Sequence, residues 1–164
     1  MGSDITVRDA RAEDAEAFVR AYELSWDAMA VPVLGKTLSE LASLESRLES
    51  FRSGLEQTSD DARVLVAERD GAIVGVATWV CDGATCELRS LYVVPEAWGT
   101  GAARQLMETA LEAMRARGAT EAVLWVVEEN GRARHFYERE DWTLDGETRA
   151  SPLGPAEVRY RRTL

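Results

Sequence analysis

The stretch from Ser90 to Met107 reads SLYVVPEAWGTGAARQLM. An apolar run typical of a buried strand stops at Pro95, and an alanine-rich run typical of a helix follows it. Gly99 and Gly101 stand between the two runs. The first turn of a helix has unpaired N–H groups and the positive end of the helix dipole, and small residues let an anion approach them. The stretch therefore fits either a plain strand-to-helix turn or a seat for a phosphate group.

The rest of the chain predicts the elements around this stretch. Hydrophobic spacing and turn residues give the order β-α-α-β-β-β-α-β-α-β-β, which is a mixed α+β (or α/β) sheet in a single domain over residues 1–164. Pro32 and Gly35 are expected to end the first helix, and Ser39 to cap the second. The predicted strands cover residues 5–8, 63–69, 72–80, 85–94, 121–127, 142–149 and 157–163, and the predicted helices cover 11–29, 39–55, 102–117 and 131–140.

The charge balance narrows the class of partner. The formal net charge is −10, and such a chain repels nucleic acid and anionic membranes, so we expect neither as a partner. The acidic residues can attract a cationic amine, or they can simply solvate the surface. No apolar run approaches the length of a membrane span, and the first residues lack a signal-peptide core. We therefore expect a cytoplasmic protein.

Cysteine and histidine are rare in this chain. Cys81 and Cys86 flank the turn Asp82-Gly83, so they can face each other and form a disulfide, although reduced thiols are the expectation for a cytoplasmic chain. His135 is the single histidine, and it lacks obvious neighbours for a zinc site or a Cys-His dyad. We expect no metal.

Two well-known nucleotide motifs fail on spacing. Gly35-Lys36-Thr37 resembles the end of a P-loop, but Ala30 stands where that motif needs a glycine, and a helix stands upstream in place of a strand. Gly99-x-Gly101 resembles the start of a dinucleotide fingerprint, but the third glycine would fall at Arg104. Neither motif explains the glycines.

Two patterns together resemble the GNAT superfamily of N-acetyltransferases. The first pattern runs from the strand into the helix, and its residues are Leu91, Val93, Pro95, Trp98, Gly101 and Ala103. Trp98 stands where the family usually has Gln or Arg. The second pattern, N-x-x-A-x-x-F-Y-E, is carried by Asn130, Ala133, Phe136, Tyr137 and Glu138, and Asp141 replaces its later glycine. The resemblance covers essentially the whole chain.

The resemblance implies a fold and a cosubstrate. The fold would be a central, mostly antiparallel twisted sheet of about seven strands with about four flanking helices, in which two central strands splay apart. The cosubstrate would be acetyl-CoA. Its pantetheine arm would run along the strand at Leu91, Tyr92 and Val93, with Trp125–Val127 as the second strand. The other residues expected to bind it are Trp98, Gly99, Thr100, Gly101, Ala102, Ala103 and Arg104 at the pyrophosphate, with Asn130 and Ala133 on the other side.

The resemblance also implies catalytic roles. Glu87 would take the proton of the acceptor amine, directly or through water, and strand alternation is expected to place it on the face of Arg89, Leu91 and Val93. Alternatively, the Glu87 carboxylate pairs with an arginine and has no catalytic role. Tyr137 would protonate the leaving thiolate of CoA; its other reading is a core aromatic. The Leu91 N–H could stabilise the developing oxyanion.

The sequence defines the binding site of the acceptor amine less well than that of the cosubstrate. In the family it is bound by the first two helices and the last hairpin, so we expect Tyr22 and Trp26 to contribute, with Trp79 and Trp125 on the strands; all four can instead be core residues. The acceptor would be a small-molecule or peptide amine, and a homodimer is compatible with the family. A CoA-binding sensor or scaffold without turnover, and an enzyme for other acyl-CoAs, are the alternatives.

Overall fold

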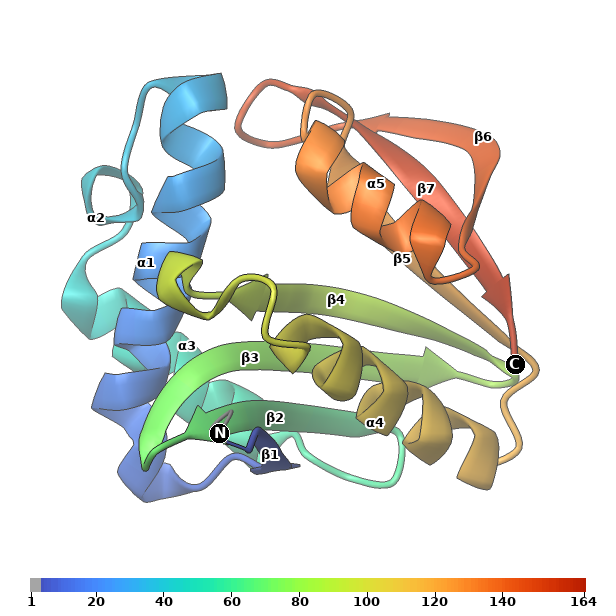
Figure 1. Ribbon diagram of the computed structural model, residues 1–164, viewed down its shortest axis with the longest axis horizontal. Helices are drawn as coiled ribbons and strands as arrows, with labels where there is room; N and C mark the ends of the chain where they lie inside the picture. Colours follow the sequence, from blue (N-terminus) through green and yellow to red (C-terminus); the bar gives the residue numbers. More distant parts are fainter. Residues whose placement is uncertain (1–3) are drawn as a thin grey trace.

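The computed structural model of the protein describes residues 4–164, which form one seven-stranded sheet with helices on both faces (Figure 1). The strands of this region are β1 (Thr6–Asp9), β2 (Ala62–Arg69), β3 (Ala72–Asp82), β4 (Thr85–Val93), β5 (Glu121–Val127), β6 (Thr143–Ala150) and β7 (Ala156–Thr163). Its helices are α1 (Ala15–Leu34), α2 (Leu38–Leu41), α3 (Leu44–Glu56), α4 (Ala102–Ala116) and α5 (Gly131–Arg139), with 3-10 turns η1 (Ala12–Asp14) and η2 (Pro95–Ala97). Residues 1–3 of the predicted domain lie outside the described residues.

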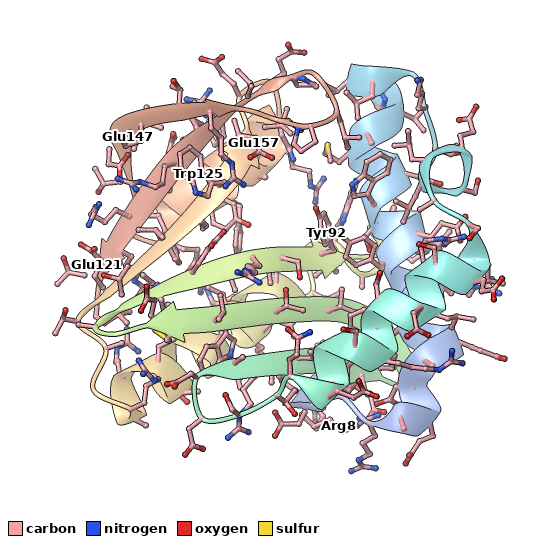
Figure 2. All side chains as sticks on the ribbon, turned by 180° about the vertical axis from the view of Figure 1, so that it is seen from behind. Arg8, Tyr92, Glu121, Trp125, Glu147 and Glu157 are labelled. Carbon is pink, nitrogen blue, oxygen red and sulfur yellow. A yellow bond between two sulfur atoms is a disulfide. The ribbon has the colours of Figure 1, made fainter. Side chains whose placement is uncertain are left out.

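The sheet order is β1-β2-β3-β4-β5-β7-β6, and only β4 and β5 pair in parallel. The predicted mixed, mostly antiparallel sheet is therefore confirmed. Helices α4 and α5 cover one face, and α1 and α3 cover the other, as Figures 1 and 2 show from opposite sides. We call these the α4 face and the α1 face. On the α1 face the helices lie over β2, β3 and β4 and leave β5, β7 and β6 open (Figure 2).

Helix α4 forms because its apolar residues recur every three or four positions, which gives it one apolar side. Leu106, Met107, Leu111 and Met114 are fully buried against the sheet. Gly75 of β3 lies beneath them, and a Cβ there would come within 2.9 Å of Leu106 Cδ1. The missing side chain lets the helix pack close to the strand, and this contact fixes the start of α4 near the end of β4.

The helix ends near α1 agree only in part with the expected ones. Helix α1 continues through Pro32 to Leu34 and is capped by Gly35, which has a left-handed φ of 67°, so the predicted stop at Gly35 is confirmed and the one at Pro32 is wrong. The proline costs one hydrogen bond near the end of a long helix, and the chain stays helical for two more residues. Ser39 does not cap a helix: Thr37 precedes the short α2, and Ser43 accepts a hydrogen bond from the Ser46 N–H at the start of α3 (3.1 Å).

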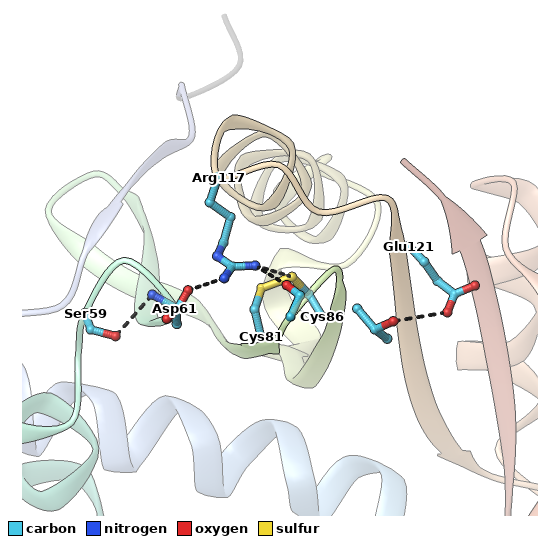
Figure 3. The surroundings of a disulfide bond; sticks show 8 residues. Ser59, Asp61, Cys81, Cys86, Arg117 and Glu121 are labelled. Atoms are coloured by element: carbon cyan, nitrogen blue, oxygen red, sulfur yellow. Dashed lines mark hydrogen bonds and ion pairs between the residues drawn. A yellow bond between two sulfur atoms is a disulfide. The ribbon is translucent and has the colours of Figure 1, made fainter.

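The β3–β4 hairpin is closed by a disulfide. Cys81 lies opposite Cys86 and is bonded to it, where reduced thiols were expected (Figure 3). Arg117, at the end of α4, donates to the Gly83 carbonyl (2.8 Å) and pairs with Asp61. The tip of the hairpin is therefore held to the end of α4.

An irregularity in β4 sets which side chains face which helices. Leu88 lies opposite Trp79 and Ser90 lies opposite Thr78, so Arg89 is an extra residue without a partner in β3. The hydroxyls of Thr78 and Ser90 are 2.7 Å apart on the α1 face. Alternation therefore shifts by one residue at this point of the strand.

Candidate active site

The pairing of β4 with β5 ends at Glu87 and Val123. Beyond this pair the two strands diverge, as Figure 1 shows between β4 and β5. The edge of β4 from Leu88 to Val93 then faces the edge of β5 from Leu124 to Val127 without strand-to-strand hydrogen bonds. The predicted splay is confirmed, and the exposed strand edges can bind an extended ligand by backbone hydrogen bonds.

A cleft of about 900 Å³ opens at the splay. Its walls come from β4, β5, the starts of α4 and α5, and the second half of α1. The sequence-predicted residues that line it are Leu91, Tyr92, Val93, Trp98, Gly99, Gly101, Ala102, Ala103, Arg104, Trp125, Asn130, Ala133 and Tyr137. Thr100 does not line it, because its N–H and its hydroxyl both donate to the Ala97 carbonyl within the loop (3.4 and 2.6 Å).

The start of α4 presents a group of free backbone donors. Gly99 and Gly101 have left-handed φ values of 76° and 89°, which favour glycine, and open space lies beside both. The Gln105 N–H bonds to the Gly101 carbonyl (3.0 Å) as the first α-helical bond. Five backbone N–H groups of this loop and first turn have no backbone hydrogen-bond acceptor among residues 4–164. They belong to Gly99, Gly101, Ala102, Ala103 and Arg104. Such a group binds a phosphate through donors and the helix dipole.

Side chains join the start of α4 and the loop before it to both ends of α5 at this end of the cleft. The guanidinium carbon of Arg132 lies 3.4 Å from the centroid of the Trp98 ring. Trp98, which stands where the family usually has Gln or Arg, also donates its indole N–H to the Val93 carbonyl (2.9 Å). Arg104 forms a forked ion pair with Glu140, with closest atoms 2.6 Å apart. Arginines thus stand at the place where phosphate charge is expected.

Tyr137 lies between the core and the cleft. Its ring packs against Phe136, Trp142 and Tyr160 at centroid distances of 5.4 to 6.2 Å. Burial raises the pKa of Tyr137 above the ordinary phenol value, so the hydroxyl stays protonated at neutral pH. Tyr137 is therefore a core aromatic that also carries a protonated hydroxyl at the wall of the cleft.

Glu87 lies elsewhere than predicted. Because Arg89 is the extra residue in β4, Glu87 shares the α1 face with Ser90 and Tyr92, whereas Leu91 and Val93 point to the α4 face. The expected common face with Leu91 and Val93 is wrong. Glu87 does not line the cleft; it lies at the apex of the splay with a long ion pair to Arg89 of 3.8 Å.

Three of the four aromatics expected at the acceptor lie outside the cleft. Trp26 and Trp79 are buried core residues, 6% and 2% exposed, and the prediction of an acceptor role is wrong for both. Tyr22 is absent from the cleft wall and packs edge-on against Tyr92 at 4.9 Å between centroids. Only Trp125 lines the cleft, on the α1 face.

The sequence reasoning missed several residues of the cleft wall. Ser25, Met29, Pro32 and Val33 of α1 line it, at the helical spacing that would have revealed them had the helix been extended past Pro32. Glu157 of β7 also lines it. No local motif marks Glu157, because its position follows from the pairing of β7 with β5. Within residues 4–164 no cluster of side chains could hold a metal, and no helix is long and apolar enough to cross a membrane.

Comparison with known proteins agrees with this arrangement. The family described as "Acetyltransferase (GNAT) family" matches residues 18–141. An uncharacterized N-acetyltransferase of Mycobacterium tuberculosis is 36% identical over 112 residues, which cover 68% of this chain and 71% of that protein. An uncharacterized N-acetyltransferase of Archaeoglobus fulgidus is 33% identical over 145 residues, with 82% and 90% covered.

A solved structure shares the fold. The PaiA N-acetyltransferase from Thermoplasma acidophilum, solved in complex with coenzyme A, superposes with a TM-score of 0.80 over 98% of this chain and 99% of that chain, at 19% identity. At this identity the likeness shows the fold alone. The chain belongs to the GNAT family of acetyltransferases.

Proposed function

We propose that the protein transfers the acetyl group of acetyl-CoA to a primary amine by direct attack in a ternary complex. The observation that carries the proposal is the single cleft that joins free N–H groups at the start of α4, an unpaired β4 edge and the Tyr137 hydroxyl. These are the groups needed to hold a pyrophosphate, to align an amide-containing arm and to protonate a leaving thiolate.

The residues present fit acetyl-CoA. The amides from Gly99 to Arg104 would hold the pyrophosphate, and the free edge of β4 around Leu91 would hold the pantetheine arm. Asn130 accepts from the Ala133 N–H (3.2 Å) and caps α5, so this side of the cleft is held in place by the helix start. When bound, acetyl-CoA supplies a thioester, whose carbonyl carbon is open to attack by an amine.

Two proton movements are assigned to this chain. A protonated amine, with a pKa of roughly 10, must lose one proton before its nitrogen can attack. We assign that proton to Glu87 through water, because its carboxylate lies at the apex of the splay and outside the cleft wall. As the carbon–sulfur bond breaks, the Tyr137 hydroxyl gives its proton to the sulfur and regains one from the acylated nitrogen. The net products are an amide, a free thiol and one proton.

The proposal is tested by binding and by thiol release. Acetyl-CoA should raise the melting temperature and give a calorimetric binding signal, and a panel of amines should include one that releases free thiol. Tyr137→Phe and Glu87→Gln should lower kcat at least tenfold while the Kd for CoA stays the same. Tyr160→Phe removes a buried hydroxyl 6.2 Å away between ring centroids, outside the cleft, and is the matched control.

The outcomes separate the alternatives. Binding of CoA without thiol release from any amine would favour a sensor or scaffold. Faster turnover of longer acyl-CoAs in competition would favour a different acyl group. Absence of acetyl-CoA binding at millimolar concentration would refute the proposal, and full kcat in both variants would refute the two assigned roles.

A further inference from the structure

Glu157 is a carboxylate of the cleft that the proposed transfer does not use. Among residues 4–164, three carboxylates line the cleft. Arg104 binds Glu140 at the phosphate end, and Glu129 is exposed just before α5. Glu157 differs from both, because it lies on the open α1 face of the sheet, opposite Val127 of β5, with its side chain 18% exposed. It is the cleft carboxylate on the side away from the α4 amides.

Arg149 already shows what Glu157 can bind. Its Nε lies 2.5 Å from Glu157 Oε2, and its guanidinium carbon lies 4.3 Å from the centroid of the Trp125 ring. A carboxylate and an aromatic face thus hold one cation together, which is the combination that recognises an ammonium group. Figure 2 shows Trp125 and Glu157 on the same face of the sheet.

The internal cation comes from the edge of the sheet. Arg149 belongs to β6, the edge strand of the sheet, and its side chain is 48% exposed. Ion pairs of exposed side chains contribute little to stability, so a better-fitting cation can take the place of Arg149. Arg149 does not itself line the cleft, whereas Trp125 and Glu157 do. A ligand in the cleft therefore meets the carboxylate and the ring first.

The α1 wall of the cleft suits the rest of such a ligand. Met29 and Val33 supply apolar surface. Pro32 has no N–H for the Ala28 carbonyl four residues before it, so this carbonyl, on a residue of the cleft wall, lacks its usual helical donor. The wall thus combines apolar surface with a hydrogen-bond acceptor and carries no cation of its own.

Tyr92 connects this end of the cleft to the proposed reaction centre. It lies on β4 on the same face and lines the cleft together with Glu157 and Tyr137, and burial raises the pKa of its phenol. Figure 2 shows Tyr92 across from Trp125 and Glu157, on the other side of the splayed strands. An amine held by Glu157 therefore lies in the same cleft as the Tyr137 hydroxyl.

We propose that Glu157 and Trp125 bind the ammonium group of the acceptor by displacing Arg149, and that the acceptor is a cationic primary amine on a compact apolar body. The inference rests on the proposed acetyltransferase function and names the substrate class and a specificity-determining residue for it. Glu157 and Glu87 then have separate tasks: Glu157 sets the affinity for the amine, and Glu87 sets the rate of transfer.

The test uses 2-phenylethylamine as the cationic probe and 2-phenylethanol as its neutral counterpart. Binding to the CoA-saturated protein is measured by calorimetry, which needs no turnover, and KM and kcat are measured with acetyl-CoA. Glu157→Gln should raise the Kd and KM for the amine about tenfold or more, with kcat within about twofold and the alcohol unaffected, because only the cation loses its carboxylate.

Two further variants decide between recognition and plain structure. Glu147→Gln makes the same charge change on an exposed residue of β6 outside the cleft and should leave the Kd unchanged. Arg149→Met removes the internal competitor and should lower the Kd and KM for the amine. If the Arg149–Glu157 ion pair only stabilises the structure, Arg149→Met should instead raise the Kd for the amine, because the loss of either partner would then weaken binding to the same extent.

The inference is overturned if wild type does not bind 2-phenylethylamine, if Glu157→Gln binds it as wild type does, or if Arg149→Met weakens binding as much as Glu157→Gln. Failure of the proposed function looks different. Wild-type protein would then bind the amine through Glu157 but release no thiol with any acceptor. A melting curve of each variant confirms that it is folded before its binding or its turnover is interpreted.

Discussion

Glu87 and Val123 are the last pair of residues that joins β4 to β5. Two residues later, Arg89 stands without a partner in β3. The splay and the extra residue therefore fall at the same point of the sheet. The splay leaves the β4 edge free for a ligand, and the extra residue turns Ser90 and Tyr92 toward the α1 face while Leu91 and Val93 face α4.

The raised pKa of Tyr137 predicts how the rate depends on pH. Burial disfavours the phenolate, so the folded pKa lies above the ordinary value of 10.0, and the hydroxyl remains a proton donor as pH rises to that value. We expect kcat to show no loss from Tyr137 between pH 7 and pH 10. A pH profile of kcat for wild type and Tyr137→Phe measures this. A wild-type decline with an apparent pKa below 10 that disappears in Tyr137→Phe would contradict it.

The disulfide predicts a modest stabilisation. Cys81 and Cys86 are five positions apart, so the bond closes a short loop and should contribute about 2 kcal/mol by restricting the unfolded chain. Urea unfolding with and without a phosphine reductant measures the difference. The double variant Cys81→Ser/Cys86→Ser should be insensitive to the reductant. A thiol count confirms that the bond is fully reduced. If the free energy of unfolding of the reduced wild type is then unchanged, the disulfide does not stabilise the fold.

The sequence predicted the parts of the fold that are set locally. Alternation, turn glycines and helical spacing identified every strand, and the small residues from Gly99 to Ala103 identified the start of α4 with its free amides. Tyr137 was found because it belongs to the second family pattern, which starts at Asn130 and continues through α5.

The remaining features depend on contacts between distant segments. The extra residue at Arg89 changes the face of Glu87, and nothing in the local sequence marks it, since it depends on the register with β3. Glu157 reaches the cleft through the pairing of β7 with β5. Trp26 and Trp79 are of a residue type that can line a pocket, but both are buried in the core. Large aromatic side chains at core-facing positions gain the most free energy by leaving water.

The partly buried pair of Arg8 and Asp14 predicts acid-sensitive stability. Arg8 forks onto both oxygens of Asp14 (2.8 and 2.9 Å), and the Arg11 N–H also donates to this carboxylate (2.7 Å). The hydrogen bonds from Arg8 are the main reason that the pKa of Asp14 is lowered from its ordinary value of 3.8. The stabilisation is therefore fully present above that value and is lost as pH falls through the lower, folded pKa.

Asp14→Asn should cost about 2 kcal/mol of unfolding free energy at pH 7, and the difference from wild type should shrink below pH 4. Urea unfolding at pH 7 and pH 3 measures both. Asp9→Asn is the control, because Asp9 pairs with Arg63 at an exposed site (3.1 Å) and should cost less than about 0.5 kcal/mol. An Asp14→Asn difference that is equal at the two pH values would show that the charge of Asp14 is not what stabilises the fold.

Gly101 tests the phosphate seat separately from backbone strain. Its φ of 89° would be strained by any Cβ, although the space beside it is open. Gly101→Ala should therefore cost about 1–2 kcal/mol of stability, and relief of the strain would turn the first amides of α4 away from the cleft. We expect the Kd for CoA to rise about tenfold, measured by calorimetry.

Gly118 provides the matched control for this change. It follows the other end of α4, has a φ of 90° and also has open space beside it, but it lies outside the cleft. Gly118→Ala should lose a similar amount of stability and keep the wild-type Kd for CoA. If both variants weaken CoA binding equally, the loss reflects general destabilisation. If neither weakens it, the amides at the start of α4 do not hold the pyrophosphate, and CoA must be bound mainly by the strand edge and the arginines.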